Sequence, residues 1–111
     1  MNYHNKRFRV LKNSENGETS AELIFHYQQT GNIVSSAYKG GAIVEGHLLG
    51  LVNENGVINM AYHQINQHGE IKTGTCISTP IIGENGKIRL IENWQWTSGD
   101  KTKGQSILEE I

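Results

Sequence analysis

The sequence has 111 residues, a length that predicts one domain, residues 1–111, with a core of its own. Ten Lys and Arg against eleven Asp and Glu leave a formal net charge of −1, and no basic run extends beyond Lys6, Arg7 and Arg9, so we expect no nucleic-acid partner. Charged residues make up 19% and hydrophobic residues 36%, a mixture that excludes a disordered chain.

The cellular setting follows from the cysteine content and from the apolar stretches. Cys76 stands alone, so a small secreted domain held by disulfides within the chain is excluded. The polar start leads into Phe8 with no apolar stretch long enough for a signal peptide, and the most apolar run, residues 47–52, is too short to span a bilayer. We therefore expect a cytoplasmic protein with no membrane partner.

A turn signal recurs along the chain: a polar residue, then Asn, Thr or His, then Gly, with Ile two positions after the Gly. The four copies centre on Gly31, Gly56, Gly69 and Gly86. Asn-Gly between apolar stretches is a strong hairpin signal, because both residues tolerate the positive φ angles of tight turns. Division at these signals predicts no helix and eight strands, which are residues 6–11, 20–28, 32–38, 42–52, 57–66, 70–79, 87–97 and 103–110.

The predicted fold class is all-β, a single-domain antiparallel meander. Eight antiparallel strands in sequence order can close into an up-and-down barrel, as in lipocalins and streptavidin, or fold into a two-layer sandwich. We favour the barrel, whose interior has room for side chains or one small ligand. The glycines at 40–41, at Gly46 and at Gly50 support it, because glycine within a strand often marks a corner or a bulge.

The fourth predicted strand places Glu45 and His47 on one face, a spacing by which a strand can offer two ligands to a metal. Zinc sites need three or four ligands, and no other His or Cys can be tied to this pair, so we assign His47 a structural or surface role and expect no metal. A two-residue turn at residues 55–56 would pair His47 with Gln64 and Leu49 with Tyr62. A three-residue turn with a bulge would shift this register by one.

The seventh predicted strand contains the most informative candidate residue. If the Ile after each turn points inward, the same face of this strand reads Ile88, Leu90, Glu92, Trp94, Trp96. A carboxylate among such groups must find a donor, bind a cation or be protonated, and Tyr62 or Gln64 could donate to it from across the barrel. The alternative is a face change at a bulge, which would leave Glu92 solvated.

Other candidates carry weaker signals. No base can be assigned to Cys76, so we interpret it as a buried thiol rather than a nucleophile. The segment 99–106 nearly matches a phosphate-binding loop, but Gln105 replaces the required Lys and too few residues follow for a helix. The two indoles of Trp94 and Trp96 could instead cap the core or flank a ligand at the rim.

Three segments, residues 62–66, 93–100 and 106–111, resemble a family of short bacterial proteins commonly labelled putative N-acetylglutamate synthase. The resemblance covers nearly the whole chain and implies transfer of an acetyl group from acetyl-CoA to the amine of glutamate. The usual acetyltransferases hold the pyrophosphate on a Gln/Arg-x-x-Gly-x-Gly/Ala loop that opens a helix. The nearest string here, residues 28–33, ends in Ile and enters a predicted strand, so no catalytic residue is carried over.

The function expected from these observations is binding of a small molecule in or near the mouth of a bacterial β-barrel. The alternatives are an acetyltransferase, as the resemblance implies, and a module that binds a partner protein through an exposed strand edge. We expect no cofactor, and the catalytic residues, the ligand and the oligomeric state stay open. The expected ligand-binding residues are Tyr62, Gln64, Glu92, Trp94 and Trp96.

Overall fold

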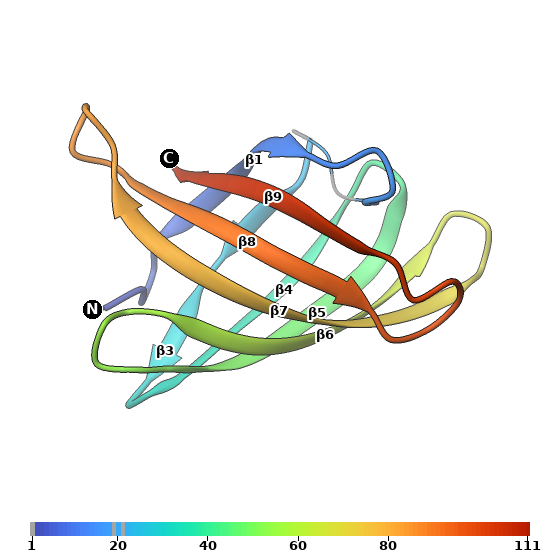
Figure 1. Ribbon diagram of the computed structural model, residues 1–111, viewed down its shortest axis with the longest axis horizontal. Coiled ribbons are helices and arrows are strands. Elements are labelled where there is room, and N and C mark those ends of the chain that lie inside the picture. Colours follow the sequence, from blue (N-terminus) through green and yellow to red (C-terminus); the bar gives the residue numbers. More distant parts are fainter. Residues whose placement is uncertain (1, 19, 21) are drawn as a thin grey trace.

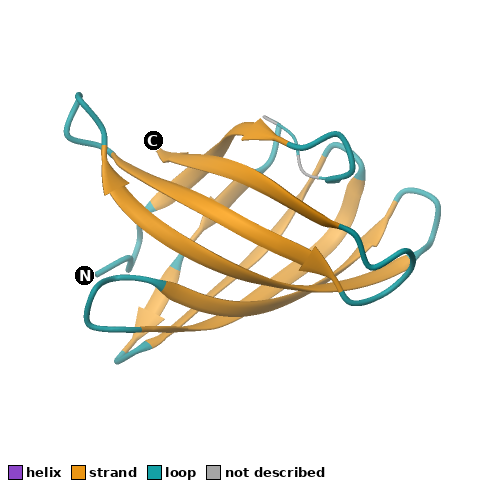
Figure 2. Ribbon diagram, in the orientation of Figure 1, coloured by secondary structure: helices purple, strands orange, loops and turns teal. Residues whose placement is uncertain are grey.

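A computed structural model describes residues 2–18, 20 and 22–111. The strands curl into a barrel (Figure 1), and the described residues form strands, turns and loops without a helix (Figure 2). The strands found in this part of the chain are β1 (Arg7–Asn13), β2 (Ile24–His26), β3 (Gln28–Thr30), β4 (Ile33–Gly40), β5 (Ile43–Val52), β6 (Ile58–Asn66), β7 (Ile71–Ile82), β8 (Ile88–Trp96) and β9 (Lys103–Glu110).

Closure of the barrel depends on the stretch that contains β2 and β3. All neighbouring strands are antiparallel, in the order β2-β1-β9-β8-β7-β6-β5-β4-β3. The first and last strands of this order are consecutive in the chain, with only Tyr27 between them. One broken strand therefore joins β1 to β4, and the sheet forms a nearly closed up-and-down barrel. The prediction of an all-β barrel is confirmed, and the alternative of a two-layer sandwich is wrong.

The predicted strand 20–28 needs a correction. Leu23 N donates to Ser20 O at 3.0 Å in a turn, so the strand begins only at Ile24, and residue 21 lies outside the described residues. Tyr27 then interrupts it: its N–H donates to Lys6 O and its carbonyl accepts from Asn5 N, both at 2.9 Å. The break lets one half pair with β1 and the other with β4, which the alternating sequence pattern does not reveal.

Three of the predicted turns are three-residue loops. In the β5–β6 loop, Asn53 N donates to Val57 O at 2.9 Å, and Gly56 has a φ of 80°. This left-handed conformation favours glycine, as the turn signal implied. The register pairs Leu48 with Tyr62, so the three-residue alternative is correct and the two-residue turn is wrong. Equivalent hydrogen bonds close the β6–β7 and β7–β8 loops.

The Ile after each turn does not always point inward. Ile58 and Ile88 are buried, whereas Ile33 and Ile71 are exposed. The cause is the residue at which each loop begins. The β5–β6 loop begins at an exposed Asn53, whereas the equivalent β6–β7 loop begins at a buried Asn66. Loops of equal length then give opposite faces to the residue two positions after the glycine, because side chains alternate along a strand.

One end of the barrel is closed by Tyr3. Its hydroxyl donates to Gly56 O at 2.5 Å, and its ring centroid lies 6.3 Å from that of Phe8 and 6.1 Å from that of Tyr27. Removal from water raises the pKa of Tyr3 to about 12. Tyr3 belongs to the same buried cluster as Val34, Ile58, Leu90 and Leu108, which are all fully or almost fully buried. With this end filled, the remaining space lies towards the other end.

Candidate functional site

The inward faces of β6 and β8 change from apolar to polar along the barrel. On β6 they begin at Ile58 and end at Gln64 and Asn66, which lie near the β6–β7 loop. On β8 they read Ile88, Leu90, Glu92, Trp94 and Trp96, and the pairing of β8 with both neighbours runs without a bulge. The apolar ends face Tyr3, so the polar ends surround the opposite opening, here called the mouth.

All five predicted ligand-binding residues line one hollow inside the barrel. Its empty volume, counted out to the open mouth, is about 460 Å³, of which about 50 Å³ admits the centre of a water molecule. The hollow therefore holds a few waters or a very small chemical group as it stands. The lining residues are Asn13, Gly17, Glu18, Phe25, Tyr38, Leu48, Met60, Tyr62, Gln64, Cys76, Glu92, Trp94 and Trp96.

Glu92 faces the interior, so the alternative of a solvated Glu92 is wrong. Its Oε2 is buried and has no hydrogen-bond partner among the described residues. Ser78 and Ser106 are its direct neighbours on β7 and β9. Burial raises the pKa of Glu92 to about 7, and the nearby Ser78 hydroxyl offsets this only in part. Two further buried oxygens in the described chain lack partners, Ser78 Oγ and Tyr27 Oη.

The expected donors to Glu92 are engaged elsewhere. Tyr38 Oη donates to Gln64 Oε1 at 3.0 Å, and Gln64 Nε2 donates to Glu18 Oε1 at 2.8 Å. Tyr62 instead packs against Trp96, with ring centroids 5.8 Å apart. The prediction that Gln64 or Tyr62 donates to Glu92 is therefore wrong, although both side chains share the hollow with it.

Three aromatic rings lie flat against the barrel wall because each one covers a glycine. Their cross-strand partners are all glycines: Tyr38 pairs with Gly46, Tyr62 with Gly74, and Trp94 with Gly104. A Cβ added at any of these glycines would overlap the partner ring. Gly46 thus makes room for the Tyr38 ring and does not mark a corner of the strand, as we expected. The bulges of β4 and β5 lie nearer the 40–41 turn.

The indole N–H groups are satisfied by polar partners. Trp94 Nε1 donates to Ser106 Oγ at 2.8 Å, and that hydroxyl donates to Asn13 Oδ1 at 2.6 Å. Trp96 Nε1 donates to Asn16 O at 3.1 Å. The two indole centroids are 5.6 Å apart in an edge-to-face arrangement. Both tryptophans are thereby fixed as rigid walls of the hollow, with Trp96 near the mouth.

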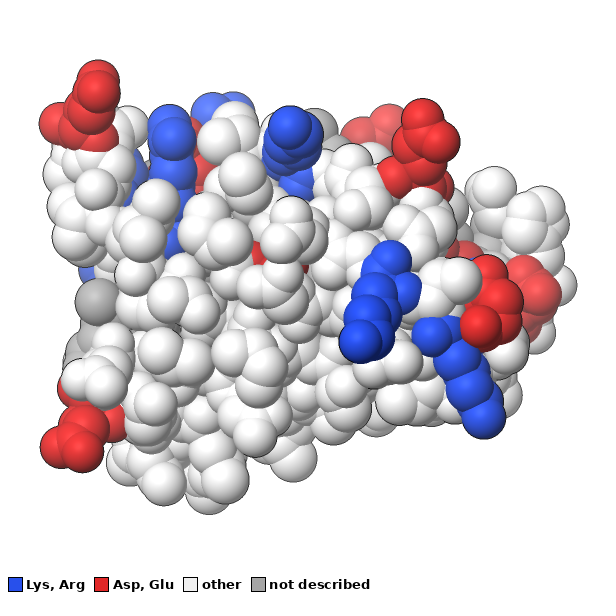
Figure 3. Space-filling view, in the orientation of Figure 1, with Lys and Arg blue, Asp and Glu red and all other residues white. Residues whose placement is uncertain are grey.

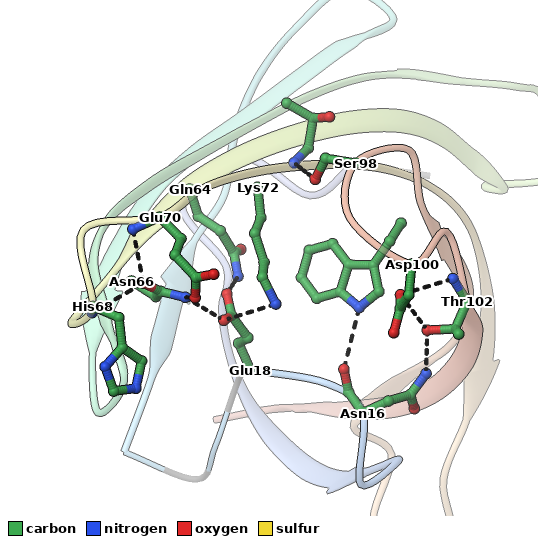
Figure 4. A network of polar contacts seen from close by, with 12 residues as sticks. Asn16, Glu18, Gln64, Asn66, His68, Glu70, Lys72, Ser98, Asp100 and Thr102 are labelled. Atoms are coloured by element: carbon green, nitrogen blue, oxygen red, sulfur yellow. Dashed lines mark hydrogen bonds and ion pairs between the residues drawn. The ribbon is translucent and has the colours of Figure 1, made fainter.

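Glu18 closes much of the mouth, and the sequence analysis missed it. It reaches from the β1–β2 loop to donors on the barrel wall (Figure 4). Gln64 Nε2 and Asn66 Nδ2 donate to its two oxygens at 2.8 Å each, and Lys72 Nζ lies 3.3 Å away. Burial alone would raise the pKa of Glu18, but these two hydrogen bonds and the Lys72 charge outweigh it and lower the pKa.

The donors that hold Glu18 are built into the wall. Asn66 Oδ1 accepts from His68 N and Glu70 N at 3.0 and 3.1 Å, which fixes the Asn66 amide in the β6–β7 loop. Lys72 Nζ also lies 5.0 Å from the centroid of the Trp96 ring. The only sequence signal for Glu18 was indirect, namely that inward amides and an inward Lys at the end of two strands need an acceptor.

The remaining candidates lie outside the hollow or are inert. Glu45 and His47 are exposed on the outer face, where the His47 and His63 ring centroids are 5.8 Å apart. No group of three or more His, Cys, Asp or Glu side chains suited to a metal occurs in the described part of the chain. Cys76 is buried, and burial raises the pKa of its thiol far above the ordinary value.

The outer surface shows no single charged face in the view of Figure 3, where scattered Lys, Arg, Asp and Glu side chains of both signs lie on a mostly uncharged surface. Outward residues of the central strands include Thr75, Ile77, Asn93 and Gln95. The end strands of the sheet, β2 and β3, have only three residues each among the described strands. The interior is thus the more distinctive feature.

Comparison with known proteins agrees with this architecture. None of the described residues belongs to a helix that could cross a membrane. Neither the curated proteins nor the solved structures that were searched include a match. The family described as avidin-like protein matches residues 1–111. Because this match covers the whole sequence, the chain belongs to the avidin-like family.

Proposed function

We propose that this protein binds a small molecule inside the barrel, with Tyr62, Gln64, Glu92, Trp94 and Trp96 as contact residues. The observation that carries the proposal is Glu92 Oε2, a buried oxygen without a partner among the described residues, on a side chain that lines an aromatic hollow. Buried polar groups are nearly always hydrogen-bonded, so such an atom indicates a missing partner. An avidin-like barrel is consistent with a small-molecule ligand.

The ligand enters past Glu18. With this side chain in place, little of the hollow is wider than a water molecule. Glu18 is carried by a loop, whereas its partners Gln64, Asn66 and Lys72 belong to β6 and β7. Release of the carboxylate therefore opens the mouth without any change in the strands, and the donors that it leaves are then available to the outer part of a ligand.

Acetyltransferase activity on glutamate, which the resemblance implies, is the competing proposal. The pyrophosphate loop of the usual acetyltransferases opens a helix, because a helix N-terminus favours the phosphate charge. The described residues of this chain form strands and loops. The interior contains a carboxyl, a thiol and phenols, but no specific contact favours acetyl transfer, so we prefer the binding function.

The test is a screen of small fragments against two matched variants. Both tryptophans of the chain line the hollow, so intrinsic fluorescence reports on it directly. Leu48→Phe adds volume to the lining, whereas Leu49→Phe places the same ring on the outer face, where Leu49 is exposed. We expect fragments that quench the fluorescence and raise Tm for the parent chain and for Leu49→Phe, but not for Leu48→Phe.

A second filled variant guards against misfolding of the first. Overpacking of a core costs about 1–3 kcal/mol, and Cys76→Met fills the hollow from a different strand. Fragments that bind equally to both filled variants would lie outside the hollow. That result, or a screen in which no fragment changes the fluorescence, would refute the proposed function.

A further inference from the structure

The ionisable side chains that line the hollow are acidic. Among the described residues around the hollow, the side chains able to carry charge at neutral pH are the carboxyls of Glu18 and Glu92, with no Lys, Arg or His. Glu18 is matched by Lys72 and by two amides at the mouth. Glu92 has no such cation. The interior therefore has an excess of acceptors.

The unpartnered oxygen of Glu92 favours a donor-rich group, because an ionised carboxylate can only accept hydrogen bonds. Ser78 lies directly opposite Glu92 on β7, and the negative charge of Glu92 acts on the Tyr27 phenol, so the three groups share one region. An ammonium group has three N–H donors and no acceptor, and a carboxylate is its strongest partner. A hydroxyl ligand, by contrast, has a single donor.

The aromatic walls favour the same chemistry. Phe25, Tyr38, Tyr62, Trp94 and Trp96 surround the hollow. Cations are attracted to the faces of such rings, and the attraction grows when water is excluded. The chain already makes one contact of this type at the mouth, between Lys72 Nζ and the Trp96 ring. At the depth of Glu92 an anion would meet the negative charge of the ionised carboxylate, with no Lys, Arg or His among the described lining residues to offset it.

We propose that the barrel selects a compact organic cation, a primary amine or an amidine, whose N–H groups donate to Glu92 Oε2. This inference rests on the proposed function and names the class of its ligand. The cationic head is small, because only about 50 Å³ of the hollow admits the centre of a water molecule. Any longer part of the ligand leaves through the mouth past Glu18.

The test compares three probes of nearly equal size: propylamine, 1-propanol and propionate. Binding is measured by quenching of the fluorescence of the two tryptophans, both of which line the hollow, and by the rise in Tm. We expect propylamine to bind at least tenfold more tightly than either other probe. Glu92→Gln keeps the shape and removes the charge, so it should abolish this preference. Glu54→Gln, in the exposed β5–β6 loop, should retain it.

Binding of the amine should also depend on pH. With a pKa of about 7, Glu92 is mostly protonated at pH 6 and mostly ionised at pH 8, so the affinity for propylamine should rise about tenfold over this range. The groups that face Glu92 from other elements are Tyr27, Tyr38, Tyr62 and Cys76. Their raised pKa values keep them neutral throughout, and Glu18, with its lowered pKa, stays ionised.

The outcomes separate this inference from the proposed function. Equal binding of the three probes would overturn the choice of a cation but leave a small-molecule site intact. A preference for propylamine that survives Glu92→Gln, or an affinity that does not change between pH 6 and pH 8, would overturn the role of Glu92. Failure of all three probes to quench the fluorescence or to raise Tm would overturn both proposals.

Discussion

Glu92→Gln should change the pH dependence of stability, because the carboxyl titrates differently in the folded and unfolded chains. Its pKa is about 7 when folded, against an ordinary value of 4.5. Between these values the folded chain binds more protons than the unfolded chain, so the free energy of unfolding falls by about 1.4 kcal/mol per pH unit. The stabilisation is complete below pH 4.5 and is lost as the pH rises through 7, a total of about 3 kcal/mol.

In the Glu92→Gln variant the side chain does not titrate, so this decrease in the free energy of unfolding does not occur. We expect the variant to gain about 2.5 kcal/mol relative to the parent chain between pH 5 and pH 8, most of it below pH 7. Urea unfolding followed by tryptophan fluorescence at pH 5, 6, 7 and 8 gives both free energies. The comparison cancels contributions from the other carboxyls, and Glu54→Gln serves as the exposed control. A difference between variant and parent that stays constant from pH 5 to pH 8 would refute the assignment of Glu92 as a buried acid.

Three other predictions concern the mouth, the wall and the chemistry. Glu18→Ala should lower the free energy of unfolding at pH 7 by about 1–3 kcal/mol, because the buried Gln64 amide loses its acceptor. In urea unfolding this loss should be smaller at pH values below the lowered pKa of Glu18, because the carboxyl of the parent chain is then protonated as well. An equal loss at every pH would contradict the contacts of the Glu18 carboxylate with the barrel wall. Gly74→Ala should force the Tyr62 ring off the wall, which should lower the free energy of unfolding in urea by about 1–3 kcal/mol and weaken the binding of propylamine. If the free energy of unfolding and the affinity for propylamine both stay unchanged, the Tyr62 ring does not pack on Gly74 as described. Acetyl-CoA should give no binding heat in calorimetry at micromolar concentrations, whereas micromolar affinity with glutamate-dependent release of CoA would restore the acetyltransferase proposal.

Much of the barrel could be predicted because its local rules are strict. Side chains alternate along a strand, so once the turn before β8 was located, Glu92, Trp94 and Trp96 had to share a face with Ile88. The same rule failed for Ile71. To apply it, one must know whether the residue that begins the preceding loop points inward, and here that residue is Asn66, which is buried although it is polar. A pattern of apolar residues alone cannot identify such an inward polar residue.

The mouth could not be predicted because its contacts join distant parts of the chain. Glu18 lies 46 residues from Gln64 and 48 from Asn66, and it comes from a loop with no periodic pattern. The break at Tyr27 was hidden for a related reason, since its two sides pair with strands whose positions depend on closure of the whole barrel. Local sequence patterns predicted the inward residues of the barrel wall. The position of Glu18 in the mouth could be seen only in the three-dimensional structure.

The three ring-and-glycine pairs mean that positions on adjacent strands cannot vary separately. At Tyr62 and Gly74, or at Trp94 and Gly104, a larger residue on one strand is tolerated only if its partner becomes smaller, because the two side chains share one volume. Related sequences should therefore show exchanges in which both members of a pair change together. Each exchange would alter the shape and polarity of one wall while the strand number and the register stay the same, so the barrel has three largely independent places at which its choice of ligand can change.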